Sequence, residues 1–243
     1  VTREALRMQA SSSPKSPPLA GTAPRAWARF AAVVIVILAA DLAIKYVAFE
    51  RVAAYPVRLV ADRQTMIDSP PAQLSGEQVV LFDEPDTIQQ TPGGIVAVPG
   101  VLNFKLTTNT GAVFGLGKGA RWLFIGVSVI AIGVIGYLFA RSPASAWWHH
   151  LGLGLILAGA LGNLYDRVVY GAVRDMLYLL PGTGLWPWIF NLADAALMAG
   201  VGLVLVLSFR QEATHGPPDR TDAVKPTPAS PPACEQRPEP ADG

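Results

Sequence analysis

Aspartates and asparagines recur in short polar motifs beside apolar stretches of the chain. Asn163 and Asp166 are three residues apart, as are Asn191 and Asp194, and Asp175 lies between the two motifs. An ionisable side chain in or beside a membrane span is costly to bury and is therefore a candidate functional group. Two carboxylates that share a proton can hydrolyse a peptide, because one activates water and the other polarises the scissile carbonyl. We take Asp175 and Asp194 as the candidate pair.

Two charged pairs and one glycine-rich segment have more than one interpretation. Asp41 and Lys45 are four residues apart and share one face of a helix. They are either an ion pair that lowers the cost of burial or part of the site. Asp166 and Arg167 are either an interfacial charge pair or site residues. Residues 109–115, taken alone, predict only a tight turn.

Other designs for a hydrolase have no support in the sequence. No H-E-x-x-H motif occurs, and the adjacent His149 and His150 fall at the opposite end of an apolar stretch from the candidate aspartates, on the other side of the membrane. Ser128 and Ser208 have no lysine or histidine at a spacing that suggests a catalytic pair. The single cysteine, Cys234, lies in a proline-rich tail. We therefore expect neither a metal nor an organic cofactor.

The elements that position these residues are predicted to be membrane helices. Of the 243 residues, 51% are hydrophobic and only 15% are charged, which is too apolar for an ordinary soluble domain. The formal net charge of +1 gives no reason to expect a nucleic-acid partner. Four apolar stretches approach the roughly 20 residues that cross a bilayer: 27–49, 121–140, 147–168 and 188–209. Tryptophans, which prefer the headgroup region, mark the edges of these stretches: Trp27, Trp122, Trp147, Trp148, Trp186 and Trp188.

The sequence thus predicts an all-α membrane protein whose four-span domain covers residues 25–210. An even number of spans places both termini on one side of the membrane and the loops 50–120 and 169–187 on the other. The candidate aspartates and asparagines then gather at one membrane face. Arginines flanking the spans favour the cytoplasm for the termini, although only weakly, because other basic residues flank the opposite ends: Arg25, Arg29, Arg141 and Arg210.

The segments outside the spans differ in composition. Residues 95–106 alternate imperfectly around a Pro-Gly pair, which predicts two short strands and a small sheet on the outer membrane face. Residues 56–92 are polar and without a sustained period, and we interpret them as an inserted loop on the periplasmic side. Residues 1–24 and the proline-rich residues 211–243 are predicted to be disordered tails.

Five motifs occur in the order that is typical of lipoprotein signal peptidases, also called signal peptidase II, and the chain resembles this family over residues 27–209, apart from the insertion. The family's D-x-x-x-K is similar to the segment from Asp41 to Lys45, and its N-x-G-A-x-F-G to residues 109–115. Its G-N-x-x-D-R, G-x-V-x-D and F-N-x-A-D are matched by residues 162–167, 171–175 and 190–194. One departure is Arg174, where the family commonly has an apolar residue.

The resemblance implies that Asp175 and Asp194 form a catalytic aspartate dyad. It also implies a group of residues that support the site or bind substrate: Asp41, Lys45, Asn109, Gly111, Asn163, Asp166, Arg167 and Asn191. The implied substrates are prolipoproteins that carry a diacylglyceryl group and are cleaved just before the lipidated cysteine. The implied location is the bacterial cytoplasmic (inner) membrane, where the chain contacts lipid, with the site at the periplasmic or outer face and both tails in the cytoplasm.

Two other functions remain open from the residues alone. In a proton-coupled transporter or channel subunit, intramembrane aspartates would relay protons. Aspartates gathered at one face, rather than threaded through the membrane, count against this alternative. An inactive scaffold or membrane chaperone with the same fold is a third possibility.

Overall fold

A computed structural model describes residues 17–54, 57–60, 78–81, 84, 88–111 and 120–214, the last four of them as backbone only. The chain divides into a compact unit that ends at Leu207 and a second unit from Ser208 onward. The tail predicted over 211–243 lies outside the described side chains. So do residues 1–16 of the other tail and most of the 56–92 insertion.

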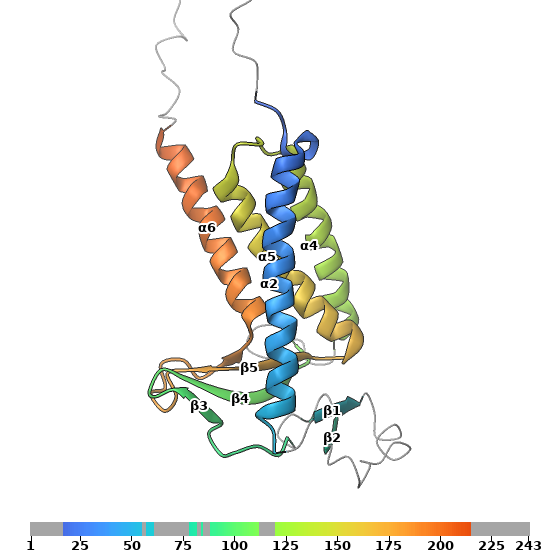
Figure 1. Cartoon of the computed structure of the whole chain (residues 1–243), viewed down its shortest axis with the longest axis vertical. Coiled ribbons are helices and arrows are strands. Elements are labelled where there is room, and N and C mark those ends of the chain that lie inside the picture. The colour runs from blue at the N-terminus through green and yellow to red at the C-terminus, as the bar shows by residue number, and fades with distance from the viewer. Residues whose placement is uncertain are drawn as a thin grey trace, which may run out of the picture. The chain divides into compact units, whose positions relative to one another are not determined.

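Four long helices run through the described part of the first unit, and the last of them continues beyond Leu207 (Figure 1). They are α2 (Pro24–Arg51), α4 (Arg121–Arg141), α5 (Trp147–Val169) and α6 (Leu192–Thr214). Among the described residues, α2, α4 and the Leu192–Arg210 part of α6 are long and apolar enough to cross a membrane. The stretch predicted as the third span forms α5, which has 23 residues. It is not among these three, because histidines, glycines and the polar residues near its end reduce its hydropathy.

Helix α5 packs against α2, α4 and α6. Glycines bring the helices close together, since a Cβ added at Gly159 would meet the backbone of Ala193 in α6, and one added at Gly154 would meet Val33 in α2. Small residues at helix contacts allow such close backbone approach in membrane proteins. At the other end of the bundle, Phe30 of α2 stacks on Phe139 of α4, with ring centroids 4.1 Å apart.

The N-terminal tail is shorter than predicted. Leu19 bridges to Pro143, and the short 3₁₀ helix η1 (Ala20–Thr22) follows it. Ala20 is fully buried, and its N–H donates to the carbonyl oxygen of Ser142 at 2.8 Å. Residues 19–23 therefore belong to the packed unit, because small apolar side chains there cover the end of α4.

A four-stranded antiparallel sheet lies beside the end of the bundle at which α2 ends (Figure 1). Its strands, in spatial order, are β3 (Ile95–Val98), β4 (Leu102–Asn109), β5 (Val173–Leu179) and β6 (Ile189–Phe190). The two strands predicted within 95–106 are confirmed as β3 and β4, and Gly100 takes a positive φ of 71° in the turn between them. In the insertion, β1 (Val57–Val60) and β2 (Gln78–Leu81) form a separate parallel pair.

The start of the fourth apolar stretch was predicted wrongly. Residues 189–190 form β6, which pairs with β5 through Leu177–Phe190 and Tyr178–Ile189. Helix α6 begins only at Leu192. The apolar pair Ile189 and Phe190 extends the hydropathy pattern of the helix, but its backbone bonds to the sheet. This register sets the position of the residues that follow.

Candidate active site

Lys45 lies at the centre of a buried polar cluster between α2 and α5. Its side chain is 0% exposed, and its Nζ lies 2.8 Å from Asp41 Oδ2, 3.1 Å from Asp166 Oδ2 and 3.3 Å from Asn163 Oδ1. The first two contacts are ion pairs, and the third is a hydrogen bond that the ammonium group donates. The ion-pair interpretation of Asp41 and Lys45 is confirmed, and their part in a functional site stays a prediction. The residues form an ion pair, and Lys45 also contacts the motif at the end of α5.

Asp166 does not form its ion pair with the adjacent Arg167. Its Oδ1 accepts hydrogen bonds from Arg174 Nε at 3.2 Å and Nη2 at 2.9 Å, and its Oδ2 accepts one from the Arg174 backbone N–H at 3.0 Å. Arg167 Nη2 instead donates to the carbonyl oxygen of Gly111 at 2.9 Å, and its guanidinium lies over the ring of Phe124. Adjacent residues on a helix do not face each other, which explains the difference.

Three side chains accept hydrogen bonds from backbone N–H groups at the start of α6. The backbone N–H of Asp194 donates to Asn191 Oδ1 at 2.9 Å, and the N–H of Asn191 donates to Asp194 Oδ2 at 3.4 Å. This reciprocal pattern is a capping box. Asp41 Oδ1 also accepts the N–H of Ala193 at 2.9 Å. Carboxylates are favourable at a helix N-terminus because they satisfy its unpaired N–H groups and its dipole.

The structure brings the two candidate aspartates together through two amide side chains. Asn191 Nδ2 donates to Asp175 Oδ1 at 2.6 Å and to Asn163 Oδ1 at 3.2 Å. Asn163 Nδ2 in turn donates to Asp194 Oδ1 at 2.7 Å. Each carboxylate is therefore oriented by an amide that also bonds to the other amide. Asp175 comes from β5, Asn163 from α5, and Asn191 and Asp194 from the start of α6.

The environments of the two aspartates differ. Asp175 is 1% exposed, whereas Asp194 is half-buried. Burial raises the pKa of the Asp175 carboxyl well above its ordinary value, and the negative charge of Asp194 raises this pKa further. A close pair of carboxyl groups in unequal surroundings is the arrangement in which one holds a proton while the other accepts one.

Asn109 is the last residue of β4, and Gly111 follows it by two residues. Asn109 Oδ1 accepts the N–H of Gly111 at 3.0 Å, which forms a tight turn, and Arg167 fixes the carbonyl oxygen of Gly111. The remaining residues of this motif, 112–115, lie outside the described part of the chain. Arg167 also lies within electrostatic range of Asp194 and Asp175.

Arg174 is a residue whose role the sequence did not reveal. It lies in the strand β5, where neighbouring residues such as Arg174 and Asp175 point to opposite faces. Arg174 is nevertheless buried, and its guanidinium lies over the ring of Tyr170 at 4.1 Å. The available signal was a cation within an apolar strand, eight residues after Asp166.

Comparison with solved structures supports the same fold. Two bacterial membrane enzymes determined by the in meso method, at 2.3 and 1.9 Å resolution, resemble this chain with TM-scores of 0.55 and 0.51. The first has 20% sequence identity and covers 79% of this chain and 93% of its own. The second has 21% identity and covers 73% and 90%. Together with the apolar helices, this likeness defines a multi-pass membrane protein.

The chain belongs to the signal peptidase (SPase) II family, whose sequence profile matches residues 33–210. A lipoprotein signal peptidase of Desulfitobacterium hafniense is 39% identical over 118 residues, which are 49% of this chain and 76% of that protein. One from Vibrio cholerae is 41% identical over 90 residues, 37% of this chain and 52% of that protein. One from Latilactobacillus sakei is 40% identical over 123 residues, 49% of this chain and 77% of that protein. The family resemblance predicted from the motifs is confirmed.

Proposed function

We propose that this chain is an aspartic endopeptidase that removes signal peptides from diacylglyceryl-modified prolipoproteins and cleaves before the lipidated cysteine. The observation that carries the proposal is the pair Asp175 and Asp194, joined through Asn191 and Asn163. Membership of the signal peptidase II family supports peptide hydrolysis over proton transport. The names of the relatives support prolipoproteins as substrates.

The different surroundings of the two aspartates assign them different roles. Asp175, with its raised pKa, is the protonated partner and donates a hydrogen bond to the scissile carbonyl oxygen. Asp194, which is half-buried, takes a proton from water as the water oxygen bonds to the carbonyl carbon. The C–N bond then breaks, and the proton held by Asp194 passes to the leaving nitrogen. The amides of Asn191 and Asn163 hold both carboxyl groups in place during these transfers.

The place of the dyad suits a substrate whose acyl chains remain in the bilayer. Asp194 lies in the first turn of α6, an apolar helix long enough to cross the membrane. Leu185, which is 75% exposed, and Trp188 precede this helix by only a few residues. The ring of Trp188 favours the membrane interface, and the exposed Leu185 suits contact with lipid. The scissile bond next to a lipidated cysteine lies at the same depth, so the peptide reaches the dyad without extraction of its lipid.

We further propose that α5 is the fourth membrane span. At about 1.5 Å per residue its 23 residues extend about 34 Å, enough for the hydrocarbon core. Its ends are tied to those of α4, because Arg121 Nη2 donates to the Val168 carbonyl oxygen at 2.9 Å and the Ser142 hydroxyl bonds to His150 at 2.8 Å. An antiparallel helix that is bound at both ends of a spanning helix crosses the same thickness.

Four spans put both termini on one side, for which we propose the cytoplasm, with the dyad and the four-stranded sheet at the periplasmic face of the inner membrane. An alkaline phosphatase fusion after Arg210 is therefore expected to be inactive. A fusion at Gly182, in the loop between β5 and β6, is expected to be active. The reverse pattern would exclude this orientation.

The direct test of the proposed activity uses the purified full chain and a synthetic precursor in detergent. The precursor carries either a diacylglyceryl group on its lipobox cysteine or an unmodified cysteine. We expect cleavage of the first precursor only, with a product whose N-terminal residue, identified by mass spectrometry, is the lipidated cysteine. Absence of cleavage in a folded preparation would favour the scaffold alternative. Cleavage without proton flux in sealed vesicles would exclude the transporter alternative.

A further inference from the structure

Arg174 binds Asp166 more completely than a surface ion pair would. Arg174 is 5% exposed, and Asp166 is 0% exposed. Three donors of Arg174 reach the carboxylate: Nε, Nη2 and the backbone N–H. Lys45 Nζ makes a fourth contact with Asp166, an ion pair of 3.1 Å. Because Asp175 is the next residue in β5, these bonds also fix the strand immediately before the proposed dyad.

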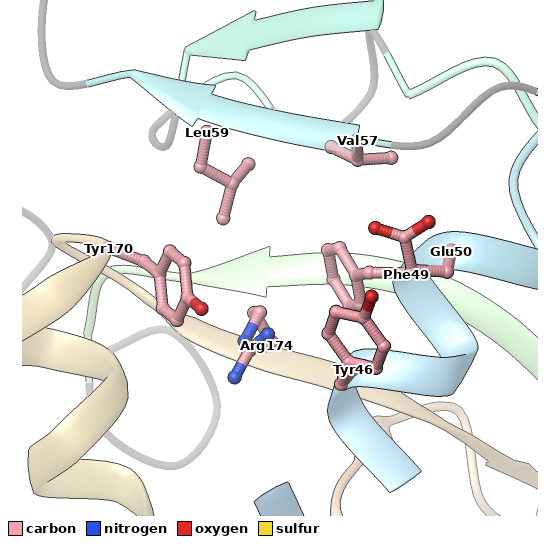
Figure 2. Close-up of a pocket in the computed structure, with 7 residues that line it drawn as sticks. All are labelled: Tyr46, Phe49, Glu50, Val57, Leu59, Tyr170 and Arg174. Carbon is pink, nitrogen blue, oxygen red and sulfur yellow. The ribbon is translucent and has the colours of Figure 1, made fainter. Parts of the chain in front are cut away.

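Aromatic rings hold the Arg174 guanidinium in this position. It lies 4.1 Å from the centroid of the Tyr170 ring and 5.9 Å from that of Phe49. Figure 2 shows Arg174 between Tyr170 on one side and the α2 residues Tyr46 and Phe49 on the other, below the strand that carries Val57 and Leu59. These side chains surround a cavity of about 100 Å³. Since neighbouring residues of a strand point to opposite faces, a peptide bound at Asp175 does not contact Arg174.

The charges near the dyad balance only when Arg174 is counted. Asp41, Lys45, Asp166 and Arg174 form a connected buried cluster of two acids and two bases. Among the described residues, the other charged groups near the dyad are Arg167 of α5 and Asp194 itself, and the exposed Glu50 of α2 lines the cavity beside Arg174. From β4, the neighbour of Asp175 is Thr107, which does not titrate. Without the Arg174 charge, the buried cluster would carry one uncompensated negative charge.

The charge on Asp166 affects both members of the proposed dyad. It raises the pKa of the Asp175 carboxyl, whereas Lys45 lowers it. Lys45 also bonds to Asn163, the amide that orients Asp194. If Arg174 were neutral, Asp166 Oδ1 would lose its two donors, and the lysine would be drawn toward that oxygen. Asn163 would then lose its hydrogen bond from Lys45, and the amide that orients Asp194 would no longer be held in place.

We propose that Arg174 is a positioning residue of the active site, which neutralises Asp166 so that Lys45 remains bound to Asn163 and the dyad keeps its geometry. This inference rests on the proposed peptidase function. It assigns Arg174 a role in the rate of the chemical step and in its pH dependence, and none in substrate binding.

The test compares the pH profiles of precursor cleavage by the wild type, Arg174→Met and Arg174→Lys, each normalised to folded enzyme. For Arg174→Met we expect kcat to fall by about tenfold to a hundredfold, the size of effect that a small misplacement produces. We expect KM to remain within about twofold and the kcat/KM profile to move to higher pH, because losing a positive charge raises the pKa of Asp175. Arg174→Lys is expected to restore the wild-type profile in large part.

A charge-balanced variant separates this role from simple stability. The double variant Asp166→Asn, Arg174→Met leaves only the Asp41–Lys45 pair in the buried cluster. The pH profile of kcat/KM of this double variant is expected to return toward that of the wild type. A wild-type profile for Arg174→Met, or a rise in KM alone, would overturn the inference. If Arg174→Met does not fold, Arg174→Gln, which keeps donors but not charge, must show the same shift. Wild-type cleavage in the same series tests the peptidase function itself, so the two failures are distinguishable.

Discussion

Replacing Gly159 by alanine tests how closely the proposed catalytic dyad depends on the contact between α5 and α6. The added Cβ would lie 2.4 Å from the carbonyl oxygen of Ala193 and 3.0 Å from Leu197 Cγ. An ordinary contact begins at 3.4 Å, so the shortfall against the carbonyl is 3.4 − 2.4 = 1.0 Å. The obstacle is backbone rather than a flexible side chain, so the first turn of α6 must move away from α5.

This movement has consequences for both stability and turnover. Overpacking a tight contact typically costs about 1–3 kcal/mol. Asp194 is the next residue after Ala193, and a displacement of its carboxylate by about 1 Å can lower turnover by about a hundredfold. The hydrogen bond from the Ala193 N–H to Asp41 would also lengthen. We therefore expect Gly159→Ala to unfold at a lower temperature and to lose activity beyond its loss of folded protein.

The matched control is Gly133→Ala in α4, where an added Cβ meets nothing within 4 Å. Alanine in a helix interior is favoured over glycine by about 1 kcal/mol, so this variant should be as stable as the wild type or more stable, with full turnover. The measurements are thermal unfolding in detergent, followed by tryptophan fluorescence, and precursor cleavage per folded molecule. If Gly159→Ala matched the control in both, the close approach of α5 and α6 would be wrong.

Two further predictions concern pH and the chain termini. The pKa of the Asp175 carboxyl is raised in the folded protein. Its contribution to stability is therefore complete at a pH below the pKa that it has in the unfolded chain. This contribution is lost as the pH rises through the pKa that it has in the folded protein. Asp175→Asn should therefore gain stability over the wild type as the pH rises above about 4, by about 1.4 kcal/mol for each unit of pKa shift. A difference in unfolding free energy that does not change with pH would contradict this. Removal of residues 1–16 and 215–243 should leave turnover within about threefold, because tails of this composition contribute little to a packed core. Removal of 1–22 should instead destabilise the protein, since it deletes the buried Ala20; equal melting temperatures for the two truncations would refute this.

Much of the arrangement follows from pattern and span count. Apolar runs of the right length predicted the four helices, and the Pro-Gly pair within 95–106 predicted the hairpin of β3 and β4. The convergence of Asn163, Asp175 and Asp194 was predicted from an even number of spans, which would place the segments that carry them at one membrane face. Their side chains do bond to one another through Asn191.

The partners of individual charges could not be predicted in the same way. Sequence adjacency suggested Asp166 with Arg167, but the helix turns the two apart, and β5 brings Arg174 to Asp166 from a different element. Hydropathy placed Ile189 and Phe190 in a helix because it does not distinguish an apolar strand from an apolar helix. The capping residue Asn191 was the signal for the true start of α6.

The most direct test of the proposed mechanism measures precursor cleavage by Asp175→Asn, Asp194→Asn and the double variant, each normalised to folded enzyme. Asparagine keeps the size of the side chain but can neither hold nor accept the transferred proton. We expect each single variant to lose at least about a thousandfold in turnover, and the double variant to be scarcely worse, because both residues act in the same step. Turnover above about a tenth of wild type in either single variant would contradict the assignment of Asp175 and Asp194 as the catalytic dyad.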